Sequence, residues 1–125
     1  MKKYYYKDIL MRTSENHTYA FAIIKEFEDG SIACLGCSKD RANAEKNMRS
    51  IISWTIQDLE FYEKLNEARK SGKTTFMAKG HNRKETMRKT SSYDNITDAE
   101  EMIESARRSI EEFNRTVKIV EIEER

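Results

Sequence analysis

The sequence of 125 residues contains no proline. It therefore lacks the rigid turns and polyproline segments that are typical of linkers between domains. No apolar run approaches the roughly 20 residues that a membrane-spanning helix needs. The N-terminus is basic, but Lys7 and Asp8 interrupt any apolar segment that a signal peptide would need, so we expect none. Without a secretory signal, the two cysteines indicate free thiols in a reducing cytoplasm.

Charged residues make up 36% of the chain and hydrophobic residues 38%, which is usual for a globular protein with much solvated helix surface. The length is enough for one domain with a real core, and we expect a single domain over residues 1–125.

Alternating apolar residues predict the sheet. Lys3–Met11 is expected to be one strand, and His17–Glu28 a second. Asp29-Gly30 is typical of a two-residue type I′ hairpin turn, which would lead into a third strand. The register expected from this turn pairs Phe27 with Ile32, Lys25 with Cys34, Ile24 with Leu35 and Ala22 with Cys37.

Two helices follow in the pattern. The first is expected from about Asp40 to Lys70, with Ser38 or Asp40 as its cap, and would be about 45 Å long. Its apolar width exceeds one amphipathic face. It is therefore either bent or divided over one core, or it packs on another copy, and we favour a homodimer or larger ring. The capping box at residues 97–100 opens the second helix, which is expected to end at Asn114.

A last strand is expected over Thr116–Glu123. The predicted fold class is α+β, with the order strand, strand, strand, helix, basic segment, helix, strand. One antiparallel sheet would carry the two long helices on one face, in an oligomer.

Two short motifs resemble functional sites, but a structural role explains each of them better. Cys34-Leu35-Gly36-Cys37 is a lone CxxC pair, and the expected register places its cysteines on opposite faces of the sheet, which favours buried free thiols over metal or redox roles. The stretch Ser71-Gly72-Lys73-Thr74 resembles the end of a P-loop, but Glu67 stands where the motif needs glycine. Gly72 is more simply a helix C-cap. We expect no catalytic residue, no metal and no cofactor, and hence no enzyme.

The stretch from Arg69 to Asn95 is the candidate binding segment. From Arg69 to Lys89 it holds eight Lys/Arg against one acid, Glu85, a net charge of +7 in a chain whose net charge is +1. Three interpretations stay open: a solvated loop, a nucleic-acid surface, or a site for a small nucleotide-like anion. For the third, the residues that supply cations, rings and an amide are Phe76, Arg83, Tyr93, Asn95 and Arg107.

This layout resembles the phage anti-Thoeris proteins of the first type, in size, element order and residue types over most of the chain. Those small oligomers of a sheet and two helices sequester cyclic ADP-ribose-type signals made by TIR enzymes. In that family an aromatic residue and an asparagine before the last helix, with an arginine on it, hold the ligand. The resemblance implies that Phe76, Asn95 and Arg107 or Arg108 take these places. Some members also bind cyclic oligonucleotides, which the basic residues here would permit.

The function expected is therefore a non-enzymatic, oligomeric phage sponge for a cyclic nucleotide immune signal. Arg83 and Arg107 would pair with phosphates, Phe76 or Tyr93 would stack on adenine, and Asn95 would hydrogen-bond ribose or base. The alternative is a small phage or bacterial regulator that binds nucleic acid or a protein through residues 69–95.

Overall fold

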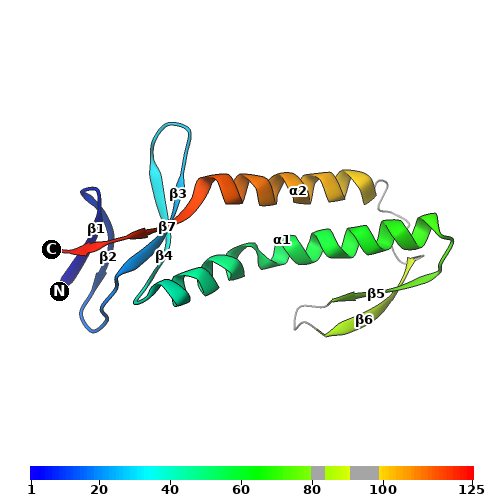
Figure 1. Ribbon diagram of the computed structural model, residues 1–125, viewed down its shortest axis with the longest axis horizontal. Coiled ribbons are helices and arrows are strands. Elements are labelled where there is room, and N and C mark those ends of the chain that lie inside the picture. The colour runs from blue at the N-terminus through cyan, green and yellow to red at the C-terminus, as the bar shows by residue number, and fades with distance from the viewer. Residues whose placement is uncertain (80–83, 91–98) are drawn as a thin grey trace. The chain divides into compact units, whose positions relative to one another are not determined.

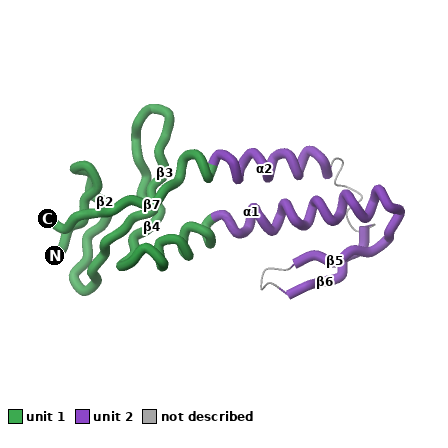
Figure 2. The backbone as a smooth tube through the Cα atoms, in the orientation of Figure 1, with its two compact units in different colours: residues 1–51, 113–125 green, residues 52–112 purple. Residues whose placement is uncertain are grey.

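The computed structural model describes residues 1–79, 84–90 and 99–125. Its fold is α+β with antiparallel sheets and two helices, which confirms the coarse fold class (Figure 1). The chain divides into two compact units, residues 1–51 with 113–125 and residues 52–112 (Figure 2). That residues 1–125 fold as a single domain stays a prediction. Neither described helix has the length and apolarity needed to cross a bilayer.

The first unit begins with a hairpin where one strand was predicted. β1 (Lys2–Tyr6) and β2 (Ile9–Ser14) are antiparallel, and β8 (Glu123–Glu124) pairs with the other edge of β1. The prediction of a continuous strand over Lys3–Met11 is wrong because Lys7 and Asp8 form a tight turn with φ of 46° and 65°. These residue types carry no glycine or asparagine signal for such a turn.

A second three-stranded sheet holds the core of the same unit. Its order is β4 (Ile32–Ser38), β3 (Phe21–Glu26) and β7 (Val117–Glu121), all antiparallel. Ala22, Ile24 and Val120 form a buried cluster on this sheet. The central strand is buried on both faces, because Ile23 between them is also inaccessible.

The β3–β4 hairpin has a longer loop than predicted. Gly30 N–H donates to Phe27 O at 3.0 Å and Phe27 N–H donates to Ser31 O at 2.9 Å, while φ is positive only at Gly30, at 86°. This is a three-residue loop with glycine in the left-handed position, so the two-residue type I′ turn was wrong. The register near the loop is therefore shifted by one residue.

A β-bulge at Leu35 restores the predicted register beyond it. Ile24 pairs with Cys34 and Ile23 with Gly36, so Leu35 has no partner on β3. The predicted pairing of Ala22 with Cys37 is confirmed. The predicted partners of Phe27, Lys25 and Ile24 are each wrong by one residue, because the loop is one residue longer than predicted.

Helix α1 (Arg41–Lys70) has the predicted bounds and caps. Asp40 is the N-cap, because its Oδ1 accepts the N–H of Asn43 at 2.7 Å. At the other end Gly72 has φ of 73°, its N–H donates to Arg69 O, and Lys73 N–H donates to Ala68 O at 2.8 Å. This pair of bonds is the Schellman motif, which confirms Gly72 as a C-cap residue.

The second unit contains a hairpin within the segment predicted to lack regular structure. β5 (Thr75–Lys79) and β6 (Glu85–Lys89) are antiparallel, with Met77 opposite Met87. The prediction missed them because each strand is only five residues long and ends in a lysine. One face of β5 packs on α1, in a cluster whose buried members are Leu65, Ala68, Phe76 and Ala78.

Helix α2 (Ala99–Thr116) runs two residues beyond the predicted end at Asn114. Asparagine is a weak stop, and β7 follows the helix directly at Val117. The apolar stripe is confirmed at Ala99, Ile103 and Ala106, which are buried. Thr97 and Asp98 of the predicted capping box lie outside the described residues.

Candidate functional site

Phe76, one of the five predicted ligand-binding residues, lies in the core of the second unit. Its side chain is buried, and its ring meets that of Phe61 on α1 edge to face with centroids 5.4 Å apart. The guanidinium of Arg88 lies 5.1 Å from the centroid of the same Phe61 ring. Phe76 thus has a packing role in this structure, and stacking on a ligand stays a prediction.

Arg107 lies in a groove between α1 and α2 of the second unit. The groove has a volume of about 860 Å³, within the range of small-molecule sites. It does not include Phe76, so the structure does not bring these two predicted residues together. The residues that line it are Glu63, Asn66, Glu67, Lys70, Ser71, Glu100, Ile103, Glu104 and Arg107.

The cations of this groove are paired with carboxylates. Arg107 Nη2 lies 3.3 Å from Glu63 Oε1, and Lys70 Nζ lies 3.0 Å from Glu100 Oε1. All four side chains are largely exposed, so each ion pair is worth at most about 1 kcal/mol. A ligand that brings its own negative charge can therefore exchange with these carboxylates at small cost.

The other three predicted site residues, Arg83, Tyr93 and Asn95, lie outside the described residues. The chain matches no family model, no curated protein and no solved structure. The roles of Arg83, Tyr93 and Asn95 in ligand binding stay predictions.

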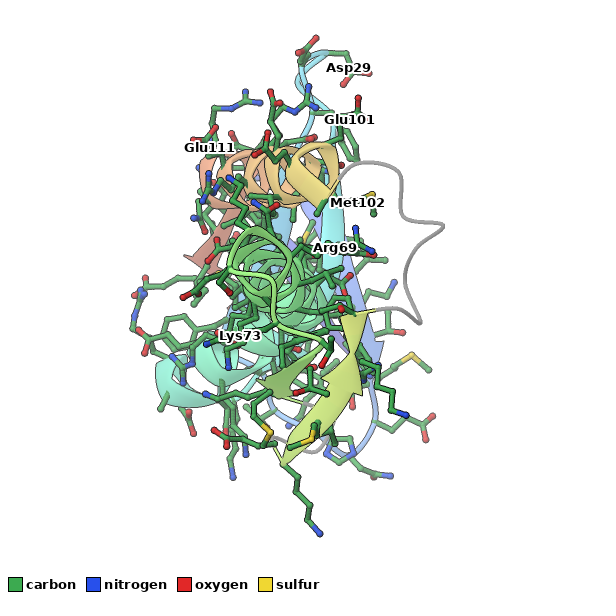
Figure 3. All side chains as sticks on the ribbon, turned by 90° about the vertical axis from the view of Figure 1, so that its right-hand side faces the viewer. Asp29, Arg69, Lys73, Glu101, Met102 and Glu111 are labelled. Atoms are coloured by element: carbon green, nitrogen blue, oxygen red, sulfur yellow. The ribbon has the colours of Figure 1, made fainter. Side chains whose placement is uncertain are left out.

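Of the residues that line the groove, only Arg107 was predicted from the sequence as a site residue. Of the acids of α2, Glu101 and Glu111 are exposed on the helix surface (Figure 3). Glu100 and Glu104 instead line the groove. The sequence feature that could have indicated the groove is the polar run at the end of α1, which contains Asn66, Glu67, Lys70 and Ser71.

The β5–β6 hairpin and the end of α1 before it are basic. Residues 69–79 and 84–90 hold seven Lys/Arg against Glu85. Arg69 is at the last turn of α1 and Lys73 follows the helix (Figure 3). The exposed members of this set on or beside the hairpin are Lys73, Lys79, Lys84 and Lys89.

The cysteine pair differs most from its prediction. Cys34 and Cys37 are free thiols, but Cys34 is exposed and Cys37 half-buried, so the prediction that both are buried is wrong. Their Sγ atoms lie 3.8 Å apart, so the prediction that they occupy opposite faces is also wrong. The bulge at Leu35 is the reason. Within the described residues, no group of three or more His, Cys, Asp or Glu is placed to hold a metal ion.

Proposed function

We propose that this protein binds a small cyclic nucleotide signal of the cyclic ADP-ribose type and holds it without turnover, as a phage counter-defence sponge. The observation that carries the proposal is the groove between α1 and α2, with Arg107 and Lys70 on its opposite walls. Its volume suits a ligand of nucleotide size.

The lining supplies the hydrogen-bonding types that such a ligand needs. Arg107 can bind a phosphate in bidentate fashion, and Lys70 can bind a second as a point charge. The carboxylates of Glu67 and Glu104 and the amide of Asn66 accept hydrogen bonds from ribose hydroxyls. Four carboxylates and two cations give the groove a net negative charge. Phosphate binding therefore requires that Arg107 separates from Glu63 and Lys70 from Glu100.

The remaining predicted residues complete the proposal. Arg83 would bind a phosphate, Phe76 or Tyr93 would stack on adenine, and Asn95 would hydrogen-bond the ribose or base. Since Phe76 is buried against Phe61, Tyr93 is the better candidate for stacking.

Exposed apolar side chains on α1 support an oligomer. Ile51, Trp54 and Ile56 are 43%, 55% and 40% exposed, which is unusual for large apolar residues so close together on one helix. We propose that a second copy covers them in a homodimer or larger assembly. Light scattering of wild type and Trp54→Glu tests this: the variant should have a lower mass, and an unchanged mass would contradict the proposal.

The binding test uses cyclic ADP-ribose isomers and cyclic oligonucleotides as probes. The protein is incubated with each, separated from free ligand and heat-denatured. Release of intact ligand is expected, whereas chemically altered ligand would show an enzyme. Arg107→Ala should weaken binding about tenfold or more, while Arg108→Ala, its exposed neighbour outside the groove, should not. Equal affinity of both variants and wild type would overturn the assignment of the groove.

The alternative function, a nucleic-acid-binding regulator, is favoured by one observation. β5–β6 is a basic two-stranded ribbon, and the major groove of DNA admits such a ribbon. Binding would then fall steeply as salt rises, because phosphate contacts release counterions. If this function is correct, Lys79→Ala and Lys89→Ala should each reduce the slope of log affinity against log salt concentration by about one.

A further inference from the structure

The bulge at Leu35 brings the two cysteines of β4 to one face of the sheet. Cys34 pairs with Ile24 and Cys37 with Ala22, two residues apart on β3 and therefore on the same face. In an unbulged strand, residues three apart point to opposite faces. The extra residue removes this mismatch, and the Sγ atoms meet at 3.8 Å.

The surroundings of the pair stabilise a thiolate at Cys34. Arg12 on β2 places a positive charge near both sulfurs, and the Sγ of Cys37 lies within hydrogen-bonding distance of Cys34. The hydrogen bond from Cys37, with smaller effects of the Gly36 backbone and Arg12, lowers the pKa of Cys34 to about 6. The same hydrogen bond and burial raise the pKa of Cys37. The exposed cysteine is thus the better nucleophile, and the half-buried one retains its proton.

We propose that Cys34 and Cys37 form a thiol–disulfide exchange site whose co-reactant is a small disulfide of the glutathione class. The Cys34 thiolate attacks one sulfur of the disulfide RSSR, a Cys34–SR bond forms, and the first RS⁻ leaves and takes up a proton. Cys37 then loses its proton and attacks Cys34 Sγ. The second RS⁻ leaves, and the protonated products are two RSH and one Cys34–Cys37 disulfide. Two electrons pass from the dithiol to RSSR.

The geometry is close to that of the product. A disulfide bond is about 2.05 Å long, so the sulfur atoms need to approach by less than about 2 Å. The backbone between them can adjust, because Gly36 has no side chain and nothing lies within 4 Å of where its Cβ would be. The half-buried Cys37 packs against the core cluster of Ala22, Ile24 and Val120, which keeps the resolving thiol beside its partner.

The test incubates the full-length reduced protein with oxidised glutathione at neutral pH and follows its intact mass. Wild type should lose two hydrogens and carry no glutathione. Cys37→Ser should gain one glutathione at Cys34 and keep it. Cys34→Ser should react at least about tenfold more slowly than Cys37→Ser, because its remaining thiol is half-buried whereas Cys34 is exposed. Circular dichroism of the three reduced proteins shows whether the serine variants are folded.

Two results would overturn the proposal. One is wild type that accumulates one or two glutathione adducts without an internal disulfide, which would show that the thiols do not meet. The other is equal reaction rates of the two single variants, which would show that Cys34 is not the attacking group. If a variant is unfolded, alkylation of wild type followed by peptide mapping gives the same comparison of the two thiols.

Discussion

Phe76 on β5 and Phe61 on α1 meet edge to face, with their ring centroids 5.4 Å apart and their planes at 61°. This contact attaches the β5–β6 hairpin to the helix. Leu65, Ala68 and Ala78 complete the buried cluster around it. The hairpin has little other apolar support, since Met77 and Met87 lie on its outer face.

Phe76→Ala should therefore destabilise the second unit by about 3 kcal/mol, because a buried ring is removed and a cavity remains. Denaturant unfolding measures this. Met77→Ala is the matched control, since the neighbouring side chain is 41% exposed, and it should cost well under about 1 kcal/mol. Equal stability of the two variants would show that the cluster is not formed.

Phe76→Leu separates packing from ligand stacking. Leucine keeps most of the apolar volume and should fold, at a cost of about 1–2 kcal/mol. If Phe76 acts only in the core, the variant should keep wild-type affinity for the cyclic nucleotide probes. A large loss of affinity in a folded Phe76→Leu protein would instead assign the ring to the ligand.

Glu63→Gln should strengthen anion binding in the groove. Glu63 holds the Arg107 guanidinium at 3.3 Å, and glutamine removes the competing charge while it keeps the shape. An exposed pair is worth up to about 1 kcal/mol, so affinity for a phosphorylated ligand should rise by about three- to fivefold. Isothermal titration calorimetry measures this, with Glu111→Gln, exposed on α2 outside the groove, as the control. Weaker binding in Glu63→Gln would show that Glu63 itself contacts the ligand.

The parts of the fold that depend on local chemistry could be predicted from the sequence. Asp40 and Gly72 mark the ends of α1 because a side-chain cap and a left-handed C-cap residue act within a few residues of the helix. The Lys7–Asp8 turn could not, because lysine, unlike aspartate, does not favour positive φ, and no glycine marks the turn.

The parts that depend on distant residues were missed. Glu63 and Arg107 are 44 residues apart, and no local pattern indicates that they meet across a groove. The loop is one residue longer than Asp29-Gly30 suggested, and β4 then contains a bulge at Leu35 that the sequence did not indicate. Residues three apart lie on opposite faces of an unbulged strand, so the missed bulge is what placed the cysteines apart in the prediction.

Gly30→Ala tests the loop that produces this register. Gly30 has φ of 86°, a conformation that costs an alanine about 1 kcal/mol even though its Cβ would meet nothing within 4 Å. Gly36→Ala is the control: its site is equally open and does not have positive φ, so it should be neutral or slightly stabilising. Thermal unfolding of both variants measures the difference. Equal effects would contradict the three-residue loop.

The ion pair between Glu26 on β3 and Lys118 on β7 should make stability depend on acid pH. The two charged atoms lie 2.6 Å apart, and the hydrogen bond from Lys118 lowers the pKa of Glu26. A lowered folded-state pKa contributes stability above the ordinary glutamate pKa of about 4.3, and this contribution is lost as pH falls through the folded value. Wild type should thus be more stable than Glu26→Gln at pH 6 to 7, and the difference should shrink toward pH 3. Urea unfolding at several pH values measures this. Glu121→Gln, exposed on β7, should show a smaller change, and a constant difference for Glu26→Gln would contradict the pairing.

Arg12 should control the reactivity of Cys34 through its charge. Arg12 lowers the pKa of Cys34, after the larger effects of Cys37 and the Gly36 backbone, so alkylation of Cys34 should rise with pH through about 6. Arg12→Gln should move this rise to higher pH and slow alkylation at pH 6, because the thiolate loses a nearby positive charge. The rate of iodoacetamide labelling against pH measures both changes.

Arg12→Lys separates charge from packing. The Arg12 guanidinium also lies over the Tyr19 ring at 5.1 Å, so a neutral variant alters a contact as well as a charge. Lysine keeps the charge and should retain most of the wild-type pH profile, whereas Arg49→Gln, which removes an exposed charge on α1, should leave it unchanged. If Arg12→Lys shifts the profile as far as Arg12→Gln does, then the stacked guanidinium, and not its charge, positions β2 against the cysteine pair.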